Sequence, residues 1–206
     1  MRRIRHRLEY LGVRVLAALA GSLSDAGRKR AGIFLGRLMR LLVPSLDRTA
    51  RDNIARAYPE WDGGRVTALA RTNFGHVGRV ALEFFSSRAM TPEAILGKIR
   101  FEGQEVFDAA LAEGKGVFLF GGHLGNWEWG GLALHLRGYR LHSIWRRMSN
   151  PLVEDLVCGI RTRFGGELIG HRNAVRPVLK ALKEGGVVAF LMDQRARGGD
   201  FVPSRF

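Results

Sequence analysis

Apolar side chains recur three and four residues apart through roughly the first 88 residues, which is the spacing that gives a helix one apolar face. The pattern predicts helices over 4–20, 24–43, 47–58 and 63–88. Ser24 or Asp25 is a suitable N-cap for the second of these helices, and Pro44 ends it. Pro59 ends the third. We therefore expect residues 1–90 to form a helical N-terminal region.

After residue 90 the pattern changes to strands that alternate with helices. Thr91, Pro92 and Glu93 open a short helix, with Thr91 as its N-cap and Pro92 in its first position. Strands are predicted over 98–103, 116–120, 139–145, 167–170 and 187–192, and helices over 104–113, 125–137, 151–163 and 173–184. Such alternation is typical of a mainly parallel sheet flanked by helices, so we expect residues 91–206 to be α/β in fold class.

The chain is strongly basic, with 33 Lys and Arg residues against 19 Asp and Glu residues and a formal net charge of +14. A field of this sign attracts nucleic acids, anionic lipid surfaces or an acidic carrier protein. Nucleic acid is disfavoured because the N-terminal arginines alternate with apolar helical faces and no recognition motif appears. The single cysteine, Cys158, excludes an internal disulfide and fits a reducing compartment.

The apolar runs at 10–23 and 31–43 resemble interfacial helices more than membrane spans. Arg14, Arg37 and Arg40 interrupt them before they reach the roughly 20 apolar residues that cross a bilayer. Arginines between apolar faces are typical of helices that lie in the membrane interface. We therefore expect a membrane-associating N-terminal region that binds anionic lipids. The alternative is two amphipathic helices that cover a globular core.

The segment GGHLGNWEWGG at 121–131 concentrates the candidate chemistry. It follows the predicted strand 116–120 and precedes a helix, and this is where α/β folds place ligands. His123 is a candidate general base, and Glu128 is a carboxylate that can fix its tautomer. On one regular helix the two would lie about 140° apart around the axis. They can pair only if His123 lies in the turn before the helix and Glu128 lies in its first turns.

Glycines at 121, 122 and 125 favour a tight turn whose free N–H groups, at a helix N-terminus, can bind developing negative charge. These features favour a general base that acts on a hydroxyl, with an oxyanion forming nearby. Spacing alone leaves a purely structural histidine open. A zinc site is poorly supported because there is no histidine pair four residues apart and no Cys partner. A serine nucleophile is poorly supported because G-x-S-x-G is absent.

The H-x-x-x-x-E element resembles the signature of the bacterial lipid A biosynthesis (late) acyltransferases, within the glycerolipid and lysophospholipid acyltransferase superfamily. The resemblance covers nearly the whole chain and rests on further segments in the same order: LEYLGVRVLAALAGSL, RTARDNIARAYPEW, IWRRMSNP, RTRFGGELI and FLMDQR. It implies an enzyme at the cytoplasmic face of the bacterial inner membrane. The implied reaction moves a fatty acyl chain from an acyl carrier protein or CoA thioester to a glycolipid hydroxyl.

The resemblance also implies roles for individual residues. His123 would take the proton from the acceptor hydroxyl, and Glu128 would orient and charge the imidazole. Gly125 and Asn126 lie in the oxyanion turn. Arg146 or Arg147, together with Arg161, would face anionic substrate groups or the oxyanion, and Asp193 matches a further acidic site position. No metal and no cofactor beyond the acyl donor is implied, and a phosphorylated acceptor and an acidic carrier protein would suit the positive field.

Two alternatives to a lipid A precursor as acceptor remain open, namely a phosphatidylinositol mannoside and a lysophospholipid. An alternative of another class is a non-catalytic, basic, membrane-associated binding protein. Relatives in the family continue beyond the DFVP run at 200–203, whereas this chain reads SRF and stops. We therefore expect a chain truncated at its C-terminus, with an incomplete sheet and substrate cleft.

Overall fold

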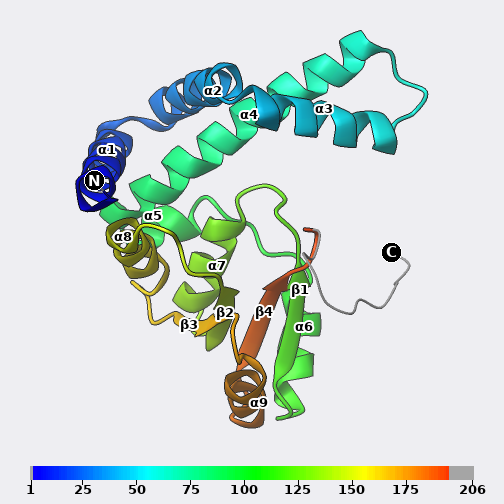
Figure 1. The fold of residues 1–206 in the computed structure, drawn as a ribbon. Helices are drawn as coiled ribbons and strands as arrows, with labels where there is room; N and C mark the ends of the chain where they lie inside the picture. The colour runs from blue at the N-terminus through cyan, green and yellow to red at the C-terminus, as the bar shows by residue number, and fades with distance from the viewer. Residues whose placement is uncertain (1, 195–206) are drawn as a thin grey trace.

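The structure is a computed structural model that describes residues 2–194. Its N-terminal part consists of the long helices α1 (Arg2–Ser22), α2 (Asp25–Leu42), α3 (Pro44–Ala57) and α4 (Gly63–Ser86). These helices form an arm above the α/β part of the molecule, and the C-terminal end of α4 reaches that part (Figure 1). The predicted N-terminal helices are therefore confirmed. Ser24 caps α2, since its hydroxyl accepts a hydrogen bond from the backbone of Gly27.

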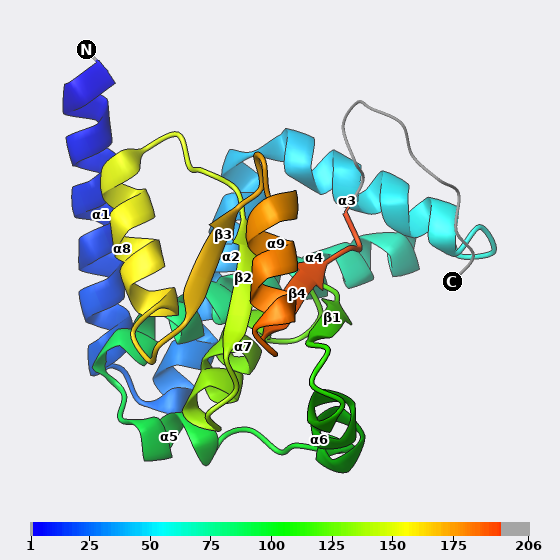
Figure 2. The same ribbon diagram turned by 90° about the horizontal axis from the view of Figure 1, so that it is seen from below.

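The α/β part contains a sheet of four strands within the described residues. The strands are β1 (Val117–Gly121), β2 (Leu141–Trp145), β3 (Glu167–Gly170) and β4 (Val187–Leu191), in the order β1-β4-β2-β3. Every neighbouring pair is parallel, which confirms the predicted α/β class. The helices α7 (Trp127–Leu136), α8 (Pro151–Arg161) and α9 (Val175–Lys183) connect successive strands, and α6 (Gln104–Ala112) leads into β1 (Figure 2).

The two faces of the sheet are covered by different helices. Val178 and Ala181 of α9 pack on Val188 and Ile169, which lie on one face. Side chains alternate between faces along a strand, so Leu141 and Ala189 point to the other face, on which α7 lies. The end of α4 leads through the short turn Ser87–Ala89 to α5 (Pro92–Leu96). Ile95 of α5 packs against Trp129 and Leu132 on the side of α7 that is turned toward α5.

The predicted strand at 98–103 is wrong, because this segment is an irregular loop. Lys98 and Ile99 donate backbone hydrogen bonds to the last residues of α5, so the chain leaves that helix in a turn. The alternation of apolar and polar residues has another cause here. Ile99 packs into the cluster around Trp129, and Phe101 lies under the guanidinium group of Arg137 at 4.6 Å.

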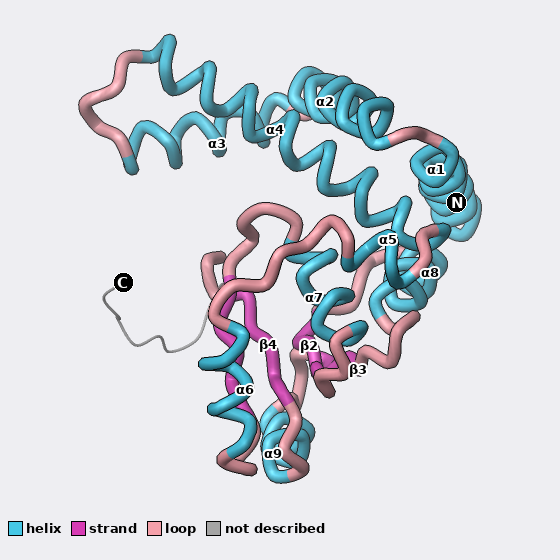
Figure 3. The backbone as a smooth tube through the Cα atoms, turned by 180° about the vertical axis from the view of Figure 1, so that it is seen from behind, coloured by secondary structure: helices cyan, strands magenta, loops and turns pink. Residues whose placement is uncertain are grey.

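Several contacts join the N-terminal helices to the α/β part. The Asn150 side chain caps α8 and donates hydrogen bonds to the backbone oxygen of His6 and to Glu9 in α1. On α4, Glu83 is bonded to the start of α7. Viewed from behind, α4 crosses directly over the loops that begin α5 and α7 (Figure 3). Over residues 2–194, no helix is both long enough and apolar enough to cross a membrane.

Candidate active site

The turn between β1 and α7 places His123 at the carboxyl edge of the sheet. Gly125 has φ of +58°, a left-handed conformation that favours glycine, and so the turn reverses sharply before the helix. Asn126 is the N-cap of α7, and its side-chain oxygen accepts a hydrogen bond of 3.1 Å from the backbone of Trp129. His123 therefore precedes the helix and Glu128 lies in its first turn, as their pairing would have required.

His123 pairs with Asp193 and not with Glu128. Because β4 is the parallel neighbour of β1, the residues that follow the two strands lie side by side. Asp193 Oδ1 is 2.7 Å from His123 Nδ1, and Asp193 Oδ2 accepts a hydrogen bond of 2.7 Å from the backbone N–H of His123. The carboxylate thus holds both the ring and the backbone of the histidine. The interpretation of Glu128 as the residue that orients the imidazole is corrected by this contact.

The charge of Asp193 determines which nitrogen of the His123 imidazole carries the proton. The hydrogen bond from the His123 side chain lowers the pKa of Asp193 below its ordinary value, and the bond from the His123 backbone adds to this. An ionised carboxylate only accepts hydrogen bonds, so the proton of a neutral imidazole must lie on Nδ1. Nε2 is then an acceptor. It lies 3.4 Å from Gln194 Nε2, and Trp127 packs edge-on against the ring at 4.9 Å.

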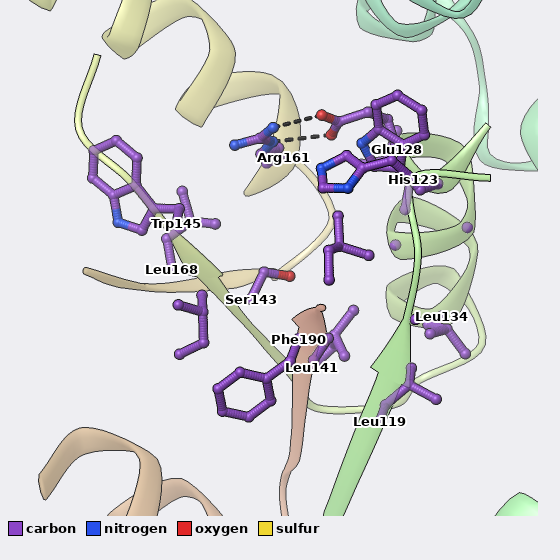
Figure 4. A pocket seen from close by; sticks show the side chains of 18 of the residues that line it. Leu119, His123, Glu128, Leu134, Leu141, Ser143, Trp145, Arg161, Leu168 and Phe190 are labelled. Carbon is purple, nitrogen blue, oxygen red and sulfur yellow. Dashed lines mark hydrogen bonds and ion pairs between the residues drawn. The ribbon is translucent and has the colours of Figure 1, made fainter. Parts of the chain in front are cut away.

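Glu128 instead forms a forked ion pair with Arg161 at the end of α8. The distances are 2.9 Å from Arg161 Nε to Oε2 and 2.5 Å from Nη2 to Oε1 (Figure 4). Burial alone would lower the pKa of Arg161, but the hydrogen bonds and charge of Glu128 more than offset this and raise it. The fork joins α7 to α8 beside the imidazole. It also keeps the guanidinium group protonated and in a fixed position, while the carboxylate compensates its charge.

Residues of α4 support the turn from behind, and sequence patterns did not predict this role. Glu83 accepts a hydrogen bond of 2.9 Å from the Asn126 amide, and its backbone oxygen accepts one of 3.0 Å from the Trp129 indole. His76 Nε2 lies 3.1 Å from the backbone oxygen of Gly125. The side chain of Asn126 is therefore occupied by structural bonds.

A cavity of about 890 Å³ opens next to His123, Glu128 and Arg161. Its wall is mainly apolar and comes from β1, β2, β3, β4 and α7, with Leu119, Leu134, Leu141, Leu168 and Phe190 among the side chains that line it (Figure 4). His135 also lines this cavity, and burial lowers its pKa, so the imidazole stays neutral there. The cavity is within the size range of ligand pockets and has the lining that a hydrocarbon chain needs.

The two candidate arginines after β2 differ in position. Arg146 lines the cavity. Arg147 is 86% exposed, and its Nε lies 4.0 Å from Glu154 Oε1 on the outside of the molecule. Of the pair, only Arg146 is placed to meet a ligand in the cavity. In the described part of the chain, no three His, Cys, Asp or Glu side chains gather closely enough to hold a metal ion.

A histidine–aspartate pair thus lies at the carboxyl ends of parallel strands, beside a mainly apolar cavity, where α/β folds place their ligands. The chain belongs to the bacterial lipid A biosynthesis acyltransferase family, whose model matches residues 1–203. A lipid A biosynthesis acyltransferase of Haemophilus influenzae is 26% identical over 189 residues. A lipid A biosynthesis myristoyltransferase of Escherichia coli is 22% identical over 188 residues.

The matches cover most of this chain but a smaller share of each relative. Each covers 90% of this chain, but only 58% of the Haemophilus protein and 57% of the Escherichia protein. The chain therefore spans rather more than half the length of the curated relatives it matches. The residues that follow Gln194, including the DFVP run, lie outside the described part of the structure.

Proposed function

We propose that this protein transfers a fatty acyl chain from an acyl thioester to a hydroxyl group of a lipid A precursor or related glycolipid. One observation carries the proposal. His123 is held by an acidic side chain through Nδ1, and the residue lines a mainly apolar cavity at the carboxyl edge of the sheet. A base that accepts a proton beside a site for a hydrocarbon chain is what this transfer needs.

In the proposed mechanism Nε2 of His123 removes the proton of the acceptor hydroxyl as its oxygen attacks the thioester carbonyl carbon. Asp193 stabilises the imidazolium ion that forms and keeps the ring in place. The tetrahedral intermediate then breaks its carbon–sulfur bond. The imidazolium returns its proton to the departing thiolate, which leaves an ester and a free thiol. A thioester is already activated, so no covalent acyl-enzyme is required.

The negative charge on the intermediate has two sources of stabilisation in this scheme. The backbone N–H groups of Trp127 and Glu128, in the first turn of α7, point toward the start of that helix, where the helix dipole is positive. Arg161 adds the N–H donors of its guanidinium group that Glu128 does not occupy, and the fork with Glu128 holds this group in one orientation. Glu128 is then a positioning residue that acts through Arg161.

The N-terminal helices support a membrane location. Ile4, Leu8, Leu11, Val15 and Leu19 lie along one face of α1, and each is at least half exposed. Phe34, Leu41 and Leu42 of α2 are also largely exposed. An apolar face flanked by arginines matches a helix that lies in the interface of an anionic bilayer. We place the protein on the cytoplasmic face of the inner membrane, where such an acceptor and an acyl carrier protein or CoA thioester would meet.

The membrane proposal is tested by sedimentation with phosphatidylglycerol vesicles. Leu8→Glu should lower vesicle binding, because it puts a charge into the apolar face of α1. Val106→Glu is the matched control, because Val106 is as exposed as Leu8 but lies on α6, away from that face. Equal binding by both variants would remove α1 from the membrane-binding surface.

The acceptor is tested with a labelled acyl chain on acyl carrier protein or on CoA. Each donor is offered with a lipid A precursor, a lysophospholipid or a phosphatidylinositol mannoside, and the labelled product is identified. The proposal predicts label on the lipid A precursor. Label on a lysophospholipid alone would move the protein to another acceptor class, and no label on any acceptor would favour a non-catalytic binding protein.

A further inference from the structure

A concave basic surface lies between α2 and α4, outside the cavity described above. It encloses about 380 Å³. One wall comes from successive turns of α2 and the other from successive turns of α4, and the lining residues are Lys29, Ile33, Arg37, Arg71, Thr72, Gly75, His76 and Arg79. We call this surface the α2–α4 groove. Residues four apart on a helix share a face, so each helix presents its basic side chains to the groove as one stripe.

Glycines bring the two stripes unusually close together. A Cβ atom at Gly36 would lie 1.9 Å from the backbone oxygen of Phe74, and one at Gly78 would lie 2.1 Å from the backbone oxygen of Gly32. Neither distance is possible between real atoms, so only glycine permits this contact between α2 and α4. The two backbones touch, and the longer basic side chains extend from both helices into the same space.

The positive charges in the α2–α4 groove are poorly compensated. Within residues 2–194 no carboxylate lies in ion-pairing distance of Lys29, Arg37 or Arg71. Arg79 Nε is buried and lies 3.3 Å from Glu83, but without hydrogen-bond geometry. Glu83 is already bonded to Asn126. Like charges held this close repel one another, so the groove favours a multiply charged anion.

The α2–α4 groove is connected to the candidate active site through His76. This residue lines the groove, and its Nε2 lies 3.1 Å from the backbone oxygen of Gly125 in the turn that carries His123. The ring of His76 would therefore lie between a ligand group in the groove and the turn that carries His123. This position suits the charged part of a substrate whose reacting atom is at His123.

We propose that the α2–α4 groove binds a phosphate group of a substrate, an inference that rests on the proposed acyl transfer. Arginine presents paired donors that match phosphate oxygens, and lysine adds a point charge. In an acyl transfer to a glycolipid, phosphate is found on the acceptor headgroup and on the phosphopantetheine arm of a carrier-protein donor. The chemistry of the groove is the same for both.

The test compares the double variant Arg37→Gln/Arg71→Gln with the control Arg30→Gln/Arg48→Gln. All four arginines are exposed, and Arg30 and Arg48 lie outside the groove, so both variants lose the same charge. A single Lys29→Gln variant repeats the test with a smaller perturbation. Circular dichroism and urea unfolding establish that each variant is folded. Binding is measured without acyl transfer, so the outcome does not depend on whether the protein is catalytically active.

The first arm measures the dissociation constant for phosphatidylcholine vesicles that carry a phosphorylated lipid A precursor, or the same lipid after phosphatase treatment. The second arm measures binding of acyl carrier protein with and without its phosphopantetheine group. The groove variant should bind the phosphate-bearing probe at least about tenfold more weakly than the control does in one of the arms, and that arm identifies the source. Equal losses in the groove and control variants, or no loss in either arm, would overturn the proposal.

Discussion

Asp193 and His123 are joined by two hydrogen bonds of 2.7 Å, although 70 residues separate them in the sequence. One bond fixes the imidazole and the other fixes the backbone of the same residue. A Cβ atom at Gly122 would lie 3.4 Å from the Asp193 carboxyl group, which is an ordinary contact distance, so Asp193 lies directly against the turn that carries His123. The carboxylate therefore sets both the position and the tautomer of the histidine.

Replacing Asp193 by Asn should impair catalysis more than folding. The amide can no longer stabilise an imidazolium ion, and it can turn its N–H₂ toward Nδ1 and favour the wrong tautomer. We expect kcat for acyl transfer to fall by about 10²-fold or more, with a smaller change in KM. The matched control is Asp52→Asn, an exposed residue of α3. A rate equal to that of the control would mean that Asp193 does not support the base.

The stabilising effect of Asp193 should depend on pH in a defined direction. Its hydrogen bond with the His123 side chain lowers its pKa below the ordinary value of 3.8 in the folded state. The contribution to stability is therefore fully present above about pH 3.8 and is lost as the pH falls through the lowered value. Urea unfolding of the wild type and Asp193→Asn should differ by a constant amount above that pH and converge below it. Convergence already at neutral pH would contradict this.

The fork between Glu128 and Arg161 should matter for stability as well as for rate. Glu128→Gln leaves a partly buried guanidinium group without its charge partner, and we expect unfolding to become easier by about 1–2 kcal/mol, since the pair is partly screened by solvent. The rate should fall because Arg161 loses its fixed orientation. Glu105→Gln, in the exposed first turn of α6, is the control. If Glu128→Gln matched that control in both measurements, the fork would have no positioning role.

Two glycine substitutions should have opposite effects on stability, because only one of the two glycines lies where α2 contacts α4. Gly36→Ala places a Cβ atom 1.9 Å from a backbone oxygen, so the helices must separate, at a cost of about 1–3 kcal/mol or more. Gly12→Ala, in α1, meets no atom within 4 Å and should stabilise its helix by up to about 1 kcal/mol. Urea unfolding of both variants measures the difference. A neutral Gly36→Ala would show that the helices are not this close.

The sequence indicated the α/β fold and the position of His123 in a turn before a helix, because both depend on local patterns. The alternation of strands and helices predicted a parallel sheet, and glycines around His123 predicted a turn before a helix. The partner of the histidine could not be predicted in the same way. It depends on β4 lying next to β1, and strand order is a property of the whole sheet. Glu128 is the carboxylate close to His123 in the sequence, so the pattern pointed to it, whereas the carboxylate that contacts the imidazole is that of Asp193.

The errors and omissions have similar causes. The segment 98–103 alternates like a strand, but its apolar side chains serve to pack a loop against α7 and Arg137. Glu83 and His76 lie in the long helix α4, where a single polar residue looks like part of a solvated face. Only the tertiary contact of α4 with the turn at Gly125 and Asn126 shows what they support. The predicted membrane association of α1 and α2 remains a prediction.

The central claim is that His123 removes the proton of the acceptor hydroxyl, and the initial rate of acyl transfer to a lipid A precursor tests it most directly. The comparison is between the wild type, His123→Ala and the control Asp52→Asn, each with its unfolding midpoint measured in urea. The account predicts a loss of about 10²–10⁴-fold for His123→Ala, an unchanged rate for the control and similar midpoints for all three. Full activity of a folded His123→Ala variant would contradict it.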